Sequence, residues 1–222
     1  MKFENTEVYN FDGAIRGARN PMNSWDKSDG KWVNGEYLIG HMDMDLLRRL
    51  ISAGSSDRKF LRQIMVCVDI TAPMYWWSEF DTYKISTVAN STSKMHKLAS
   101  TPITIDCFEH NNGFDSVNNT GDSLMAASMW NRVIDDCEKL RLRYLDTKDK
   151  RYWKTLIQLL PESWLQKRTW TANYEVIRNM VNQRKNHKLN EWSGCDDPTK
   201  PNFIAWAKSL PYADDLIFGL IH

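Results

Sequence analysis

The sequence predicts a single domain that combines helices with strands. Its 222 residues are an ordinary length for one large domain and are enough to bury a substantial core. The continuous apolar run at residues 64–68 predicts a buried strand, and apolar residues at three- and four-residue steps through residues 123–145 predict a long amphipathic helix. No internal repeat, low-complexity tract or linker divides the chain.

The first third of the chain carries clear start and stop signals. Residues 6–16 alternate enough to predict a strand that runs into a short helix. Residues 19–35 are rich in Asn, Ser, Asp and Gly, which predicts a long loop. Residues 43–54 predict a helix, because acidic residues occupy its first turn, apolar residues recur along it and Gly54 follows as a stop.

The middle and end of the chain continue this alternation of elements. The predicted buried strand covers residues 60–71, and a helix is expected over residues 72–85 because Pro73 suits the first helical position. Turn-forming residues fill positions 109–122 and predict a loop. Further helices are expected at residues 123–145, 152–160 and 202–208.

Charge, cysteine content and hydropathy exclude several classes of protein. The net charge is +1, so no global field would recruit nucleic acid or an acidic membrane. Four cysteines stand far apart without a Cys-x-x-Cys pair, which argues against a zinc or other metal site. With no signal-peptide pattern, we expect free thiols and a cytoplasmic location. Apolar runs fall short of the ~20 residues that a membrane span needs, so we expect no membrane partner.

The most informative segment is residues 160–184, which sets carboxamides and one arginine at fixed intervals along a predicted helix. At 3.6 residues per turn, Asn173 and Arg184 fall within roughly 20° of one line, whereas Asn179 is turned about 120° away. Carboxamides and a guanidinium together suit a heteroaromatic ring edge beside a phosphate. A solvated face on a surface helix is the competing interpretation.

This segment resembles the C-terminal signature of the flavin-dependent thymidylate synthases, the ThyX family. The shared residues are Leu160 and Pro161, a Trp-Thr-x-Asn at 170–173, then Asn179, Asn182 and Arg184. Residues 72–96 resemble the family's central Arg-His-Arg-x-x-Ser-x-Asn-Glu-x-Ser-x-Arg-Tyr motif in frame, but not in content. Residues 14–24 give a weaker third match, and together the three cover roughly residues 7–192.

The resemblance implies a fold, an assembly and a chemistry. The fold would be α+β, a single ThyX-like domain over residues 1–222 with a central antiparallel or mixed sheet flanked by long helices and a helical sub-region. The assembly would be a homotetramer. In that family FAD is reduced by a nicotinamide cofactor such as NADPH, takes a one-carbon unit from methylenetetrahydrofolate and helps deliver it to C5 of dUMP, a pyrimidine nucleotide.

The resemblance also assigns roles to individual residues. The implied flavin contacts are Asn90, Asn173, Asn179, Ser24 and His187. The implied catalytic residues are Ser93 and Arg184, which would face the nucleotide together with Lys84. Since Asn173 and Asn179 are expected to point apart, they would contact different parts of a ligand or two symmetry-related ligands. His187 is displaced by one residue from the family pattern, and a solvated histidine is the alternative.

The departures from the family pattern fall mainly on cations. Thr82-Tyr83-Lys84 stands at the Arg-His-Arg position, and Lys84 keeps a charge but loses the bidentate fork. Three further substitutions are Ser91 for a glutamate and Met95 and Ile157 for arginines. Candidate replacement cations are Lys84, Lys94, Lys97, Lys154 and Arg168, each of which could equally be a solvated surface charge.

Ten tryptophans are the one oddity of composition. Indoles both fill cores or subunit interfaces and stack on flat cofactors, and neither use is excluded here. Those in or next to the matched motifs are Trp76, Trp77, Trp153, Trp164, Trp170 and Trp192.

Three functions are compatible with these patterns. The first is a divergent flavoenzyme that alkylates C5 of a pyrimidine nucleotide, either dUMP or a variant such as dCMP. The second is a catalytically inactive module that binds nucleotide or protein and retains the ThyX fold. The third is a flavoprotein of another redox class. No nucleophile elbow, Walker loop or His-Glu-x-x-His motif points to a different chemistry.

Overall fold

The computed structural model describes residues 1–110 and 121–219, with side chains from residue 125 onward in the second range. The chain contacts divide it into two compact units. The first comprises Met1–Ile70, Asp81–Asn90 and Thr169–His222, and the second comprises Thr71–Phe80 and Ser91–Arg168. A single domain over residues 1–222 stays a prediction, and most of the loop predicted at residues 109–122 lies outside the described residues.

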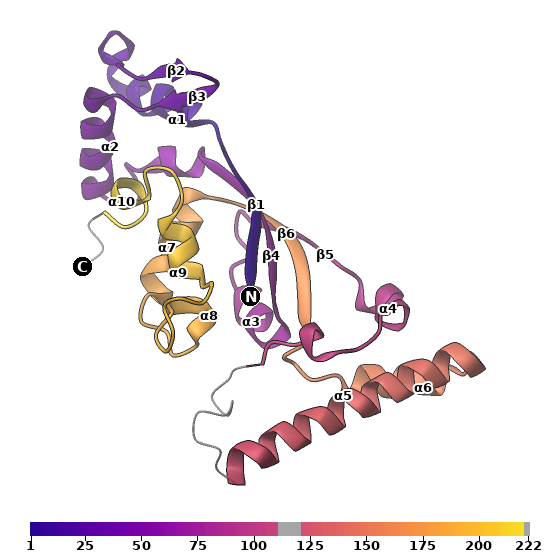
Figure 1. The fold of residues 1–222 in the computed structure, drawn as a ribbon. Coiled ribbons are helices and arrows are strands. Elements are labelled where there is room, and N and C mark those ends of the chain that lie inside the picture. Colours follow the sequence, from indigo (N-terminus) through magenta and orange to yellow (C-terminus); the bar gives the residue numbers. More distant parts are fainter. Residues whose placement is uncertain (111–120, 220–222) are drawn as a thin grey trace. The chain divides into compact units, whose positions relative to one another are not determined.

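A four-stranded sheet has the strand order β1-β4-β6-β5. Its strands are β1 (Lys2–Tyr9), β4 (Met65–Pro73), β6 (Leu165–Asn173) and β5 (Val88–Ser91). Strands and helices thus share one chain, and the α+β class is confirmed (Figure 1).

Strand β4 contains the apolar run that predicted a buried strand. Burial alternates along it, however, and the buried residues are every second one, from Val66 to Ala72. The intermediate residues are partly buried, because successive side chains of a strand point to opposite faces of the sheet. The strand predicted over residues 60–71 is confirmed from Met65 onward, whereas Lys59–Arg62 form a 3-10 turn.

Residues 19–35 are more ordered than a loop. Two short 3-10 turns, η1 (Asn20–Met22) and η2 (Trp25–Lys27), lead into strand β2 (Lys31–Val33), which pairs antiparallel with β3 (Glu36–Leu38) (Figure 1). Asn34 and Gly35 join the two strands with φ of 51° and 86°. Both residues therefore adopt the left-handed conformation that a two-residue hairpin turn requires, and the loop prediction is wrong for this stretch.

Helices α1 (Phe11–Arg19) and α2 (His41–Ala53) carry a buried ion pair that fixes the segment between them. Arg19 Nε lies 2.6 Å from Asp43 Oδ1, and both side chains are almost fully buried. Asp43 Oδ2 also accepts hydrogen bonds from the Ser28 hydroxyl and the Gly30 amide, both at 2.9 Å. A buried carboxylate is tolerated because all its oxygens are paired.

The C-terminal part of the first unit corrects the helix predicted over residues 160–184. Residues Leu165–Asn173 form strand β6, and only Tyr174–Arg184 form helix α7. The strand is favoured because alternate residues from Gln166 to Ala172 are largely buried against their neighbours in the sheet. Short helices follow at α8 (Asn190–Ser193), α9 (Phe203–Lys208) and α10 (Ala213–Leu216).

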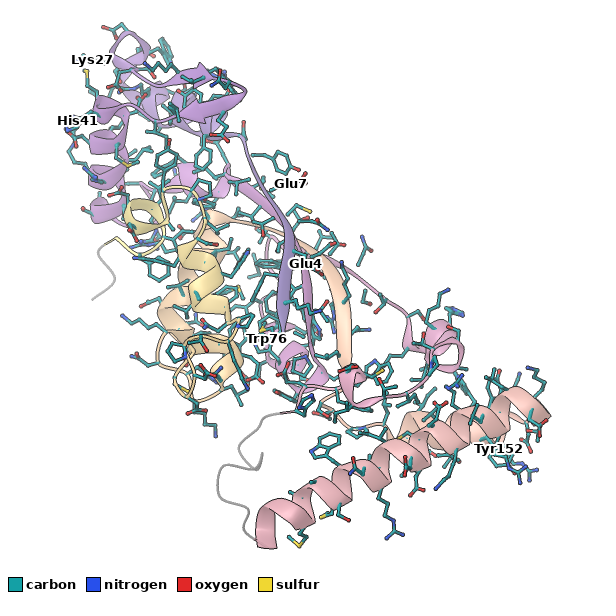
Figure 2. All side chains as sticks on the ribbon, in the orientation of Figure 1. Glu4, Glu7, Lys27, His41, Trp76 and Tyr152 are labelled. Carbon is teal, nitrogen blue, oxygen red and sulfur yellow. The ribbon has the colours of Figure 1, made fainter. Side chains whose placement is uncertain are left out.

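The second unit is largely helical. Helix α3 (Met74–Phe80) begins directly after Pro73, as predicted, but it ends at Phe80, so the prediction of a helix to residue 85 is wrong for residues 81–85. Helix α3 packs Trp76, Trp77 and Phe80 against one another with ring centroids 4.6 to 5.1 Å apart. Trp76 is fully buried (Figure 2). These indoles are therefore core residues.

The longest helix of the second unit lies beside its successor. Helix α5 (Gly121–Thr147) runs alongside α6 (Lys150–Leu159) in Figure 1, which matches the helices predicted there. Helix α4 (Lys94–Lys97) precedes them. A cluster of buried apolar residues centred on Phe108, Cys137 and Leu156 forms the core between these elements. The remaining 3-10 turns are η3 (Lys59–Arg62), η4 (Leu98–Ser100) and η5 (Ile105–Cys107).

Candidate functional site

A cavity of about 520 Å³ lies along α7, within the first unit. It is walled by the segment 82–86, which stands at the family's Arg-His-Arg position, and by the side of α7. Three residues assigned from the resemblance line it, namely Lys84, Asn173 and Asn179. This size suits a ring system of moderate extent.

Asn173 ends β6 and caps α7. Its side-chain oxygen accepts a hydrogen bond from the Val176 amide at 3.0 Å, and its backbone is extended. Since the oxygen already accepts one hydrogen bond and the side chain is 5% exposed, the two N–H donors are the groups of this carboxamide that are most available to a ligand in the cavity. The helix N-terminus beside it adds a partial positive charge.

Asn179 and Gln183 lie one turn apart on α7 and both line the cavity. The expectation that Asn173 and Asn179 point apart is wrong, because Asn173 precedes the helix and the 3.6-residue period does not apply to it. Asn179 is exposed, so its full donor and acceptor pair is presented to the cavity.

The carboxylate at this cavity is neutralised by an arginine. Glu175 is 7% exposed and receives a bidentate contact from Arg58, with N–O distances of 3.0 to 3.2 Å. Behind it, buried Arg178 donates to the Ile217 carbonyl at 2.8 Å. Burial, followed by the charge of Arg58, lowers the pKa of Arg178. The cations that line the cavity are Arg62 and Lys84.

Tyr83 ties the segment 82–86 to the end of α7. Its hydroxyl accepts from Arg184 Nε at 2.8 Å and donates to Gln183 Oε1 at 3.0 Å. The Arg184 guanidinium also lies over the Trp192 ring, 4.8 Å from its centroid. Arg184 therefore holds a wall of the cavity through Tyr83.

The other assigned residues of the first unit lie elsewhere in it. Ser24 precedes η2, and its carbonyl accepts from Arg19 at 3.2 Å. Asn90 is exposed on β5. His187 is half-buried, and its Nδ1 accepts from the Leu189 amide at 3.1 Å. His187 keeps part of its surface exposed, so the solvated histidine stays the alternative, and the flavin role of all three residues stays a prediction.

Ser93 belongs to the second unit, where it caps α4 by accepting from the His96 amide at 3.3 Å. Its neighbour Thr92 accepts from the Gln166 side chain at 2.7 Å, and Gln166 in turn accepts from Arg168 Nε at 3.1 Å. The Arg168 guanidinium stacks 4.2 Å from the centroid of Trp77. Of the candidate replacement cations, Arg168 is thus held in place and linked through Gln166 to Thr92, the residue before Ser93.

The substitution at Ile157 has a packing reason. Ile157 is partly buried against the core of the second unit, beside Leu156, where an unpaired guanidinium would be costly. Met95 is 55% exposed on α4.

Tyr83, Glu175 and Gln183 were not assigned from the sequence. The i, i+4 spacing of Asn179 and Gln183 on α7 is a signal that could have found Gln183. The contact of Tyr83 with Arg184 joins residues 101 positions apart, and no local pattern encodes it.

Two other kinds of site were sought in the described part of the chain. No group of three or more His, Cys, Asp or Glu side chains there could hold a metal ion. None of the helices described is both long enough and apolar enough to traverse a bilayer.

Comparison with solved structures identifies the fold. No family model and no curated protein sequence matches the chain. A crystal structure of the flavin-dependent thymidylate synthase ThyX from Helicobacter pylori, complexed with FAD and dUMP, superposes with a TM-score of 0.67 at 16% identity over 99% of this chain and 100% of that one. A second structure of the same enzyme with FAD and dUMP gives the same score and identity over 100% and 99%.

A third structure is more distant. The UMP/dUMP methylase PolB from Streptomyces cacaoi, bound with 5-Br UMP, gives a TM-score of 0.57 at 14% identity over 99% of this chain and 95% of that one. The chain therefore has the ThyX fold over its whole length, with a sequence that has diverged widely from these structures.

Proposed function

We propose that this chain is a flavoprotein that transfers a one-carbon unit to C5 of a pyrimidine nucleotide or nucleoside, using FAD, NADPH and methylenetetrahydrofolate. The observation that carries the proposal is the meeting of Lys84, Asn173 and Asn179 around one cavity. They come from separate segments, and the family resemblance assigns each of them to cofactor or substrate.

The lining of the cavity fits a flat heteroaromatic ring. Asn173 offers donors, while Asn179 and Gln183 offer both donors and acceptors. Such a set matches the alternating edge of a flavin or pyrimidine. A bound flavin would supply the redox and carbon-transfer chemistry that side chains cannot perform. The protein would bind and orient the ring, with Tyr83 and Arg184 holding the wall in place.

The loss of phosphate-binding cations favours a substrate other than dUMP. Each charge-assisted hydrogen bond to a phosphate is worth about 1.5 to 3 kcal/mol, and Thr82, Met95 and Ile157 supply none. Loss of two or three such contacts would weaken dUMP by at least ~3 kcal/mol, more than roughly a hundredfold. We therefore expect an unphosphorylated nucleoside to bind in preference to dUMP. dCMP has a different ring but the same phosphate, so it is the nucleotide variant that tests the ring alone.

The same loss of cations favours one second candidate, a nucleotide-binding module that kept the fold without the reaction. Flavin binding separates the two. A protein that purifies yellow, or that takes up FAD, supports the flavoenzyme. A colourless protein that cannot be reconstituted with FAD supports the module.

The deciding experiment combines a flavin titration with a product assay. FAD is titrated into the parent protein and into Asn179→Ala, with Asn186→Ala as the matched control, since Asn186 is exposed just beyond α7 and does not line the cavity. The FAD-loaded protein is then supplied with NADPH, methylenetetrahydrofolate and dUMP, dCMP or deoxyuridine. The proposal requires a C5-methylated pyrimidine by mass spectrometry from at least one of the three and little tritium release from C5-labelled dUMP.

A further inference from the structure

A second and larger cavity, of about 820 Å³, lies in the first unit and shares no lining residue with the candidate site. Its walls come from the end of β1, the start of α1, the β2–β3 hairpin and the segment 209–212. Five aromatic rings and one carboxylate characterise it, namely Tyr9, Phe11, Trp32, Tyr37, Tyr212 and Glu36.

Several of these rings are open to solvent. Trp32 is 61% exposed and Tyr9 is 48% exposed, although both are large. Trp32 and Tyr37 are directly opposite one another in the hairpin and form an edge-to-face pair with centroids 5.5 Å apart. A ring that is held in place but left accessible offers the negative face of its π-system to a cation.

The charges around this cavity are negative. Glu36 is its one carboxylate, and no Lys, Arg or His is among the residues that line it. Tyr9 donates its hydroxyl to Glu7, which raises the pKa of Tyr9 to about 12. Burial raises the pKa of Tyr37, and the charges of Asp43, Asp12 and Asp29 raise it further, against a hydrogen bond with Ser28. Both phenols therefore remain neutral near pH 7.

Three residues with a left-handed backbone conformation fix the walls of this cavity. Asn10, Gly35 and Tyr212 all line the cavity and all have left-handed φ, at 72°, 86° and 56°. An aromatic residue adopts this conformation only when its surroundings enforce it. Here the Tyr212 hydroxyl accepts from the Ile39 amide at 3.0 Å, and its ring packs edge-to-face on Phe11 at 5.5 Å. The cavity is thus preorganised.

We propose that this cavity binds an organic cation, with the rings of Trp32, Tyr37 and Tyr9 around the cationic head. Aromatic faces attract quaternary and alkylated ammonium groups. These groups are weakly hydrated, so little free energy is needed to transfer them from water into the cavity. The absence of Lys, Arg and His from the lining leaves no basic side chain to repel a cation. Phosphorylated and other anionic ligands are disfavoured by the same rings.

Choline and its uncharged isostere 3,3-dimethylbutan-1-ol test the proposal, because they share a shape and differ in charge. Calorimetric titration of the full-length protein should give at least a tenfold lower dissociation constant for choline, equivalent to about 1.4 kcal/mol. Trp32→Leu should weaken choline binding at least threefold, and Trp32→Phe should retain most of the affinity. Trp25→Leu is the matched control, since Trp25 is 49% exposed on η2 outside the cavity.

Three outcomes would overturn the proposal. They are no detectable choline binding, equal affinity for choline and its neutral isostere, and an effect of Trp25→Leu as large as that of Trp32→Leu. All the substituted residues are exposed, so the variants should fold, and circular dichroism spectra matching the parent would verify this.

Discussion

Removing the Tyr83 hydroxyl should release the segment 82–86 from α7. Tyr83→Phe keeps the ring and deletes one hydrogen bond from Arg184, at 2.8 Å, and one to Gln183, at 3.0 Å. A hydrogen bond to a charged group is worth about 1.5 to 3 kcal/mol when buried. Gln183 is exposed and Arg184 is half-buried, so water can hydrogen-bond to both after the substitution. The free-energy cost of the substitution is therefore roughly 1 to 2 kcal/mol.

Trypsin cleavage at the Lys84–Ile85 bond measures this release locally. Ile85 is 87% exposed and Lys84 is also exposed, so the protease needs only a local opening of the segment. Where opening and closing are fast, the cleavage rate follows the open population, and a loss of roughly 1 to 2 kcal/mol predicts a rate increase of about five- to thirtyfold. Mass spectrometry of the first fragments isolates this bond from other cleavage sites.

Tyr152→Phe is the control for this substitution. Tyr152 lies on α6 (Figure 2), and its hydroxyl makes no hydrogen bond to any described residue. Its removal should leave cleavage at Lys84 unchanged. Equal cleavage rates for the parent and Tyr83→Phe would refute the reasoning that Arg184 acts through Tyr83.

Three further outcomes are expected. Arg19→Gln should cost about 3 to 5 kcal/mol in urea unfolding by leaving buried Asp43 unpaired, and a loss under about 1 kcal/mol would show that the pair is unimportant. A hydrogen bond from Arg141 holds the pKa of Glu138 below its usual range, so the ionised pair stabilises the folded protein above that range and the stabilisation is lost as pH falls. Glu138→Gln should therefore reduce the loss of folding stability between about pH 5 and 3. The same dependence of stability on pH in the variant and the parent would contradict this. Light scattering should return four times the 26.0 kDa monomer mass, and a monomer at micromolar concentration would reject the tetramer.

Hydrophobic periodicity and helix stop signals were sufficient to predict the helices whose apolar face packs locally. Helix α2 ends at Ala53, directly before Gly54, and α3 starts directly after Pro73, as their terminal residues predict. Helix α5 follows the apolar steps that predicted it. In each case the deciding interactions lie within a few residues of one another, so the local sequence contains them.

The β2–β3 hairpin was missed although its signal was present. Polar composition over residues 19–35 suggested a loop, but Asn34-Gly35 is a pair that favours the left-handed turn of a two-residue hairpin. Backbone conformation at two positions outweighed average polarity. The β2–β3 hairpin also forms one wall of the proposed cation cavity, so this error concealed a candidate site.

The candidate site at α7 was predicted in part. The ThyX fold is confirmed, and Lys84, Asn173 and Asn179 do meet at one cavity. Their relative orientation was wrong because β6 continues to Asn173 before the helix starts. The pairing of Arg184 with Tyr83 depends on how distant segments pack, which helical periodicity does not report. The roles of all the assigned residues stay predictions.

Titration of FAD into the parent protein and Asn179→Ala, followed by flavin fluorescence, tests most directly whether the cavity at α7 is a cofactor site. Removing one ligand-facing carboxamide in a partly dry site costs about 1 to 3 kcal/mol. The parent should therefore bind FAD, Asn179→Ala should bind it between several-fold and roughly a hundredfold more weakly, and Asn186→Ala should match the parent. Absence of FAD binding, or the same dissociation constant for Asn179→Ala and the parent, would contradict a flavin site at this cavity.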